Sequence, residues 1–115
     1  KPVTTKFSVI EIHKSSHSTR HSFINRGALV RTNDRDDVVG HDVVKFSPRT
    51  HQRFEVKGTA FFKGEGTLKV QGGATQGNNT IPIIGGTGEF NGAAGKVKTH
   101  QLSKKRTRLT FIFVQ

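Results

Sequence analysis

The sequence predicts an all-β protein, and three features of the chain indicate this. Segments rich in β-branched residues and Phe recur at short intervals along the 115 residues, separated by clusters of Gly, Asn, Asp or Ser. No window shows a sustained helical period with capping residues. The last such segment carries apolar groups on both alternating faces, so something packs against each side of it. Roughly eight strands with short hairpins, in a single domain of residues 1–115, predict a barrel or a sandwich.

Each predicted strand is bounded by turn-forming residues. The expected strands are 5–13, 27–33, 38–47, 52–62, 66–72, 79–84, 94–102 and 106–114. The sequence NDRDD at 33–37 and KGEG at 63–66 give two of the turns. In a closed barrel, Leu109, Phe111 and Phe113 of the last strand would share the apolar lumen face. Its other face, with Thr110, Ile112 and Val114, would then form a contact in an oligomer.

The segment IPIIGGTGEFNGAAGKVK at 81–98 begins as a dinucleotide-binding turn would begin. The third glycine of that motif comes one residue late, and strand-like alternation follows in place of a helix. We therefore expect no cofactor loop here, and assign the glycines to backbone geometry at a barrel corner. The residues of this predicted loop, which should tuck one aromatic ring under the barrel rim, are Gly85, Gly86, Gly88, Phe90 and Gly92.

The formal charge of +11, from 19 Lys and Arg against 8 Asp and Glu, predicts an attraction for anions. The positive charge is spread along the chain, with one short cluster at 104–106, so a nucleic-acid partner is not indicated. No apolar run has the length of a transmembrane helix. The chain begins without Met and without a signal-like segment, which predicts a trimmed or processed chain and leaves the compartment open.

The glycine-rich segment, read together with its neighbours, resembles a known family. IIGGTGEFNGAAGKVKTHQL resembles the Gly-Gly-(Ser/Thr)-Gly-x-(Phe/Tyr) segment of the allene oxide cyclase and dirigent barrel superfamily. The sequences GTAFFKGEGTLKVQG, DDVVGHDVVKF and VIEIHKSSHSTR are similar to other segments of that family, in the same order. The resemblance implies an eight-stranded antiparallel up-and-down β-barrel, calycin-like, around an apolar pocket. It also implies a homo-oligomer, trimer or dimer, and no organic cofactor or metal.

The resemblance also implies site residues. The family's lumen glutamate falls on Glu11, and alternation independently puts Phe7, Val9, Glu11 and His13 on one strand face. A carboxyl on an apolar face would have a raised pKa. His13 stands where the family has a water-holding Asn, and Asn33 resembles its second cavity Asn, so the predicted catalytic residues are Glu11, His13 and Asn33. The alternatives are a rim Glu paired with a Lys or Arg, a solvent-facing His and an ordinary turn Asn. The predicted substrate-binding residues are Phe7, Val9, Phe46, Phe54, Phe62, Phe111 and Phe113.

Other chemistries find little support in the sequence. His13, His17 and His21 have helical spacing, but they follow a strand into a Ser-rich loop and no Cys joins them, so no metal site is expected. No Ser lies in a G-x-S-x-G elbow. The family's Ser-Pro pair after the first strand is replaced by Thr19-Arg20, and its cavity Cys and Tyr are missing because the chain has neither residue. The fold is thus recognisable while the substrate is not.

Three functions remain open at this stage. The first is a cofactor-free cyclase or isomerase that binds an apolar small molecule in its lumen and steers stereospecific ring closure. The basic charge leaves open whether that molecule also carries an anionic group. The second is a non-catalytic guide or binding protein, dirigent-like or lipocalin-like. The third is a basic surface that binds nucleic acid or acidic glycans, which lacks the exposed Tyr and Trp typical of stacking platforms.

Overall fold

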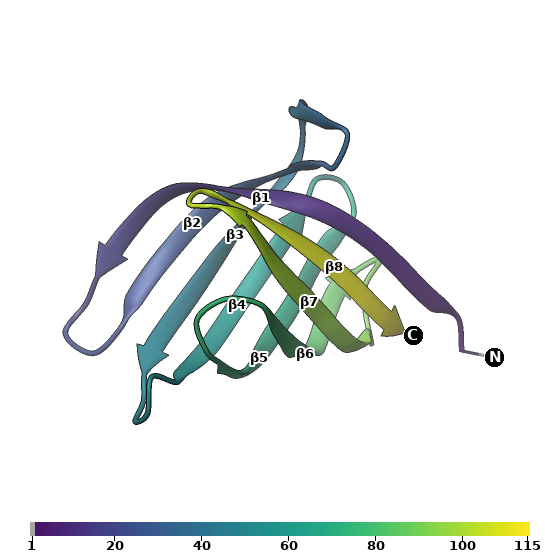
Figure 1. Cartoon of the computed structure of the whole chain (residues 1–115). Helices are drawn as coiled ribbons and strands as arrows, with labels where there is room; N and C mark the ends of the chain where they lie inside the picture. The colour runs from purple at the N-terminus through teal and green to yellow at the C-terminus, as the bar shows by residue number, and fades with distance from the viewer. Residues whose placement is uncertain (1) are drawn as a thin grey trace.

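Eight antiparallel strands close into a barrel in the computed structural model, which describes residues 2–115 (Figure 1). The strands are β1 (Thr4–Ser18), β2 (Phe23–Arg31), β3 (Asp34–Pro48), β4 (Phe54–Phe62), β5 (Gly66–Ala74), β6 (Asn79–Gly88), β7 (Ala94–Ser103) and β8 (Arg106–Val114). Each strand pairs with the next, and β1 pairs with β8 to complete the ring. The predicted up-and-down barrel is confirmed, and the sandwich alternative falls. Residues 2–115 contain no helix that could cross a membrane.

The observed strands differ from the predicted ones mainly at the start of the chain. β1 continues to Ser18, and β2 begins at Phe23 where the sequence predicts a start at 27. The extra residues pair with each other, as Ser16 does with Asn25 and Ser18 with Phe23. Ser-rich and mixed polar segments have little strand character of their own, so this pairing depends on the neighbouring strand.

One end of the barrel is filled by aromatic side chains. The ring of Phe7 lies 5.5 Å from that of Phe62 and 5.3 Å from that of Phe111, between ring centroids. Phe90 and Phe113 complete the cluster, with centroids 5.9 Å apart. Aromatic pairs at these separations add to the stability gained from burial alone. This cluster closes the lumen at the end where β1 starts and β8 ends.

The glycine-rich segment supplies one of those rings. β6 ends at Gly88, and Phe90 in the following turn is only 7 % exposed. A Cβ at Gly86 would lie 2.4 Å from the carbonyl oxygen of Phe90 and 2.8 Å from that of Thr67. The absence of a side chain at Gly86 therefore lets the turn fold back onto the sheet and bring Phe90 against the core.

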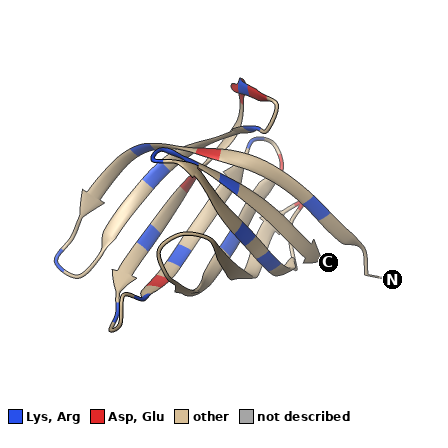
Figure 2. Ribbon diagram, viewed as in Figure 1, with Lys and Arg blue, Asp and Glu red and all other residues tan. Residues whose placement is uncertain are grey.

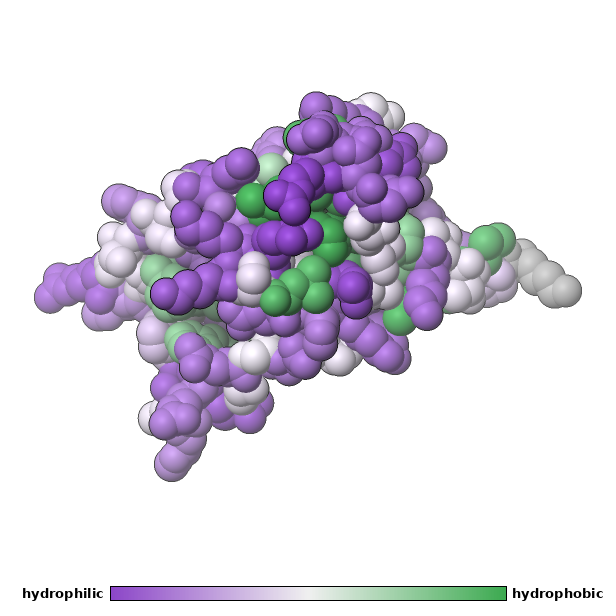
Figure 3. Space-filling view, turned by 45° about the horizontal axis from the view of Figure 1, so that its top comes forward, coloured by the Kyte–Doolittle hydropathy of each residue, from purple (hydrophilic) through white to green (hydrophobic). Residues whose placement is uncertain are grey.

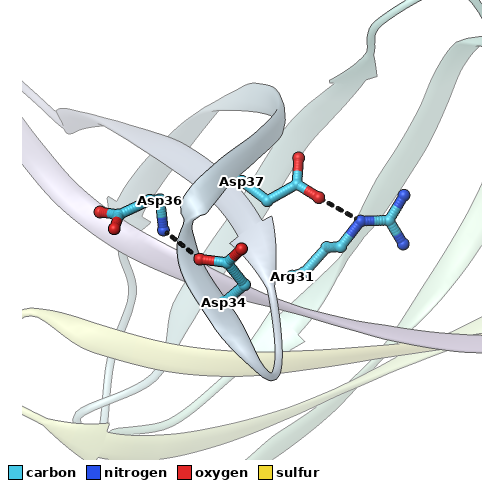
Figure 4. Close-up of polar contacts among 4 residues, drawn as sticks. All are labelled: Arg31, Asp34, Asp36 and Asp37. Carbon is cyan, nitrogen blue, oxygen red and sulfur yellow. Dashed lines mark hydrogen bonds and ion pairs between the residues drawn. The ribbon is translucent and has the colours of Figure 1, made fainter.

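Charged residues are distributed unevenly along the barrel axis. At the closed end, the β2–β3 turn carries an ion pair between Arg31 and Asp37, and the Asp36 N–H donates to Asp34 Oδ1 over 3.0 Å (Figure 4). Figure 2 shows acidic residues at this turn and basic residues on the loops at the opposite end. The space-filling view is mostly hydrophilic, with smaller apolar patches between polar side chains (Figure 3).

Candidate functional site

The lumen opens at the end opposite the Phe cluster, where it forms a cavity of about 340 Å³. Every second residue of each strand points inward, and most of these inward-facing residues are apolar, so the walls are mainly apolar. The apolar lining includes Phe23, Val44, Phe46, Phe54, Val56, Leu68, Leu109 and Phe111. The polar groups on the strands around it are Glu11, Asn25, Asp42, Thr59, Asn79, Thr99, Gln101 and Thr107. A concave, mainly apolar surface that also carries polar groups is typical of a small-molecule site.

Two carboxyl groups lie close together on this wall, one on each side of strand β2. Glu11 on β1 and Asp42 on β3 flank β2, where Gly27 is the register partner of Asp42. A Cβ at Gly27 would lie 2.8 Å from Glu11 Cγ and 2.9 Å from Asp42 Oδ1. Because Gly27 has no side chain, the two acids can meet over the intervening strand. We call Glu11 and Asp42 the acid pair.

The acid pair holds a proton at neutral pH. Burial, the hydrogen bond shared with Glu11 and the charge of Glu11 raise the pKa of Asp42 from 3.8 to about 9. Backbone hydrogen bonds at Gly27 and at Asp42 itself oppose this shift. Asp42 is only 3 % exposed, and its Oδ1 has no donor within reach among residues 2–115. Two carboxylates cannot hydrogen-bond to each other, so one member of the pair must carry a proton, and the raised pKa of Asp42 assigns that proton to Asp42.

A series of polar side-chain contacts runs from His13 through Ser16 to Asn25. The Ser16 hydroxyl donates to Asn25 Oδ1 over 2.7 Å and lies 3.1 Å from His13 Nε2. Asn25 lines the cavity, whereas His13 is half-buried and lies outside the lining. His13 therefore reaches the cavity only through Ser16 and Asn25.

The predicted site residues fall into three groups. Glu11, Phe46, Phe54 and Phe111 line the cavity. Phe7, Val9, Phe62 and Phe113 pack in the core, mainly toward the closed end, and are absent from the lining. Asn33 is exposed in the β2–β3 turn, at the end of the barrel opposite the cavity mouth.

Sequence reasoning missed Asp42, although a signal for it was present. In HDVVKF, Asp42 shares its strand face with Val44 and Phe46, the same pattern of an acid among apolar neighbours that identifies Glu11. The sequence pattern does not reveal that these two acids lie on strands on either side of β2, with Gly27 between them. Phe23 and Asn25 were missed because their segment was expected to be a loop.

The fold and the site together define a small closed barrel with an apolar cavity and a protonated acid pair on its wall. The same fold occurs in AbnU, described as an exo-specific intermolecular Diels-Alderase, with TM-score 0.81, 11 % identity, and 100 % of this chain and 99 % of that chain covered. A pyocyanin demethylase matches with TM-score 0.77 and 13 % identity over 96 % of this chain and 100 % of its own.

A third similar structure is a nonspecific heme-binding cyclase that catalyses a 4 + 2 cycloaddition during neoabyssomicin biosynthesis. It matches with TM-score 0.73 and 13 % identity over 96 % of this chain and 64 % of its own. No protein-family model and no curated protein matches the chain. At these identities the comparisons show the fold, a barrel that cyclase-type enzymes also use.

Proposed function

We propose that this protein is a cyclase-like barrel that binds an apolar small molecule in its lumen and steers its ring closure to one stereoisomer. The observation that carries the proposal is the acid pair on the wall of a mainly apolar cavity. Two of the three similar structures are described as a Diels-Alderase and a cycloaddition catalyst, which supports a cyclase over other uses of the barrel.

The neutral Asp42 is suited to polarise a carbonyl group of the substrate. A neutral carboxylic acid can donate a strong hydrogen bond where a carboxylate can only accept one. When a substrate carbonyl replaces Glu11 as the acceptor, the single O–H of Asp42 stabilises the negative charge that develops on the carbonyl oxygen in the transition state, in a site of low dielectric constant. Glu11 is the positioning acceptor that keeps the proton on Asp42 before the substrate arrives.

The apolar walls provide the rest of the rate enhancement in this proposal. Phe46, Phe54 and Phe111 restrict a flexible substrate to the folded conformers that can close. The same walls exclude water, which would otherwise compete for the Asp42 hydrogen bond. This account needs no cofactor.

We also propose that this barrel is related to the allene oxide cyclase and dirigent barrels and that it forms a homo-oligomer. Ile112 and Val114 face outward on β8, and Val114 is 41 % exposed, which supports a contact with a second copy. Sedimentation of the purified chain tests the oligomer, since a trimer or dimer would have a multiple of the 12.7 kDa chain mass.

A first experiment tests the lumen itself. Titration with N-phenyl-1-naphthylamine, a neutral apolar dye that fluoresces on leaving water, should give saturable binding. Val44→Trp should abolish it because Val44 lines the cavity and lies opposite Gly58. Lys57→Gln on the exposed outer face of β4 is the control and should bind as wild type does. Equal binding by all three proteins would show that the dye does not enter the lumen.

A second experiment tests the chemistry. Synthetic trienes, in which a diene is tethered to an alkene conjugated with a ketone, are incubated with and without the protein. Chiral chromatography then gives the rate and the stereoisomer ratio. We expect faster closure with one isomer in excess, and a loss of at least about tenfold in rate for Asp42→Asn and for Glu11→Gln. A ratio identical to that in buffer across the panel would contradict the proposal.

A further inference from the structure

The charge distribution of the barrel points to a second binding site at its mouth. The loops at the open end span 19–22, 49–53, 75–78 and 104–105. They carry five Lys or Arg residues and no acid, namely Arg20, Arg49, Arg53, Lys104 and Lys105. Five of the chain's eight acids lie instead at or beside the turns of the closed end, namely Asp34, Asp36, Asp37, Glu65 and Glu89. Basic residues such as Arg35 and Lys63 also lie at the closed end, and Glu55 lies on β4 next to the 49–53 loop, but the open-end loops themselves carry no acid (Figure 2).

Two of these loops enclose a shallow hollow beside the mouth. Arg20, His21 and Ser22 line it from the β1–β2 loop, and Pro48 and Arg49 line it from the end of β3. Phe23 borders both this hollow and the lumen, so the two spaces adjoin. We call this space the rim hollow.

Hydrogen bonds fix both loops. In the β1–β2 loop, Thr19 Oγ1 lies 2.6 Å from Ser22 Oγ, and the Thr19 N–H donates to the Ser22 carbonyl over 2.7 Å. In the β3–β4 loop, the Arg49 N–H donates to the Arg53 carbonyl over 2.7 Å. The backbone that carries Arg20 and Arg49 is therefore held in place without a ligand.

The two guanidinium groups of the rim hollow have no acidic partner. The one ion pair formed within residues 2–115 joins Arg31 and Asp37 at the other end of the barrel. Arg49 Nη1 makes only a long contact of 3.4 Å to the Pro48 carbonyl. Guanidinium groups bind carboxylate, sulfonate and phosphate oxygens in pairs of parallel hydrogen bonds, so two free ones beside hydroxyl groups match an oxo-anion.

We propose that the rim hollow binds an anionic group of the lumen ligand through Arg20 and Arg49. This inference rests on the proposed lumen function and adds to it the class of substrate. The acid pair lies about 20 Å from the rim hollow along β3, because six residues separate Asp42 from Pro48 at about 3.3 Å each. The substrate is therefore an elongated molecule with a neutral carbonyl at its inner end and an oxo-anion at its outer end.

A matched pair of dyes tests the rim hollow. N-phenyl-1-naphthylamine and 1-anilinonaphthalene-8-sulfonate share one aromatic body, and only the second carries a sulfonate. We expect wild type to bind the sulfonate dye about tenfold more tightly at low salt, with the difference shrinking as salt screens the charges. The double variant Arg20→Gln/Arg49→Gln should bind the two dyes equally. The control Lys96→Gln/Lys98→Gln removes the same charge from exposed positions on β7 and should keep the preference.

Each outcome separates this inference from the lumen function. Equal affinities in wild type, or an equal loss in both double variants, would overturn the rim hollow while binding of the neutral dye still supports the lumen. Arginine-dependent binding of the sulfonate dye alone would support the rim hollow and count against the lumen, and binding of neither dye would overturn both. Displacement of the sulfonate dye by 1-naphthoate, 1-naphthyl phosphate and 1-naphthalenemethanol then distinguishes a carboxylate from a phosphate. Equal displacement by the neutral alcohol would contradict an anion site.

Discussion

The protonation of Asp42 makes the stability of the barrel fall as the pH rises. Its pKa is about 9 in the folded protein against 3.8 for the ordinary side chain, so the folded state holds a proton that the unfolded state has lost. The stability that this group contributes is complete below about pH 4 and is lost as the pH rises toward 9. Carboxyls with a lowered pKa act in the opposite sense.

The magnitude follows from one proton. A difference of one bound proton changes the free energy of unfolding by at most about 1.4 kcal/mol per pH unit. Between pH 5.5 and 8 the Asp42 contribution therefore falls by about 3 kcal/mol. At a urea dependence of about 2 kcal/mol per molar, the unfolding midpoint should drop by about 1.5 M over this range.

Asp42→Asn is the variant that tests this reasoning. The Asn amide has the shape of the neutral acid and can donate to Glu11, but it cannot ionise. Urea unfolding followed by circular dichroism should give a wild-type midpoint that falls with pH and a variant midpoint that falls by about 1.5 M less. Asp36→Asn, at an exposed position, should retain the wild-type slope. Parallel curves for wild type and Asp42→Asn would refute a buried proton at Asp42.

Three further predictions concern stability. Gly27→Ala should cost about 1–3 kcal/mol in urea unfolding because its Cβ would overlap the acid pair, and a neutral result would show that Glu11 and Asp42 are free to separate. Phe111→Ala, which empties a site only 2 % exposed, should cost about 3–5 kcal/mol. Phe46→Ala, at a half-buried ring, should lower the free energy of unfolding clearly less. Calorimetry that found the larger loss for Phe46→Ala would contradict a barrel packed around Phe111 and open around Phe46. His51 and Gln52 both have φ of 60°, so His51→Asn/Gln52→Gly should raise the free energy of unfolding by about 1–2 kcal/mol, and a loss in thermal melting would contradict this turn.

The fold was predictable because its signals are local. Alternation and turn residues identify eight strands whatever surrounds them, as in RTRLTFIFV of β8. The pairing of Ser16 with Asn25 has no such signal, since it comes from closure of the barrel and not from the propensity of either residue.

The candidate site was predictable in its parts and not in its assembly. Glu11 stands out as an acid on an apolar strand face, and Asp42 carries the same signal in a weaker context. Their contact depends on Gly27 and on the order β1–β2–β3, which places the two acids on either side of one strand. The separation of Phe46, which lines the cavity, from Phe7 and Phe62, which close its end, depends on depth along the barrel axis. Alternation gives the face of a strand but not that depth.

The most direct test of the acid pair is the carboxyl carbon of Asp42 itself. Protein labelled with ¹³C at the Asp side-chain carboxyls is titrated by NMR, and Asp42→Asn assigns the signal. At pH 7 we predict one of the four Asp carboxyls at the chemical shift of the protonated acid. Four signals that all titrate together near pH 4 would contradict the neutral acid on which the account depends.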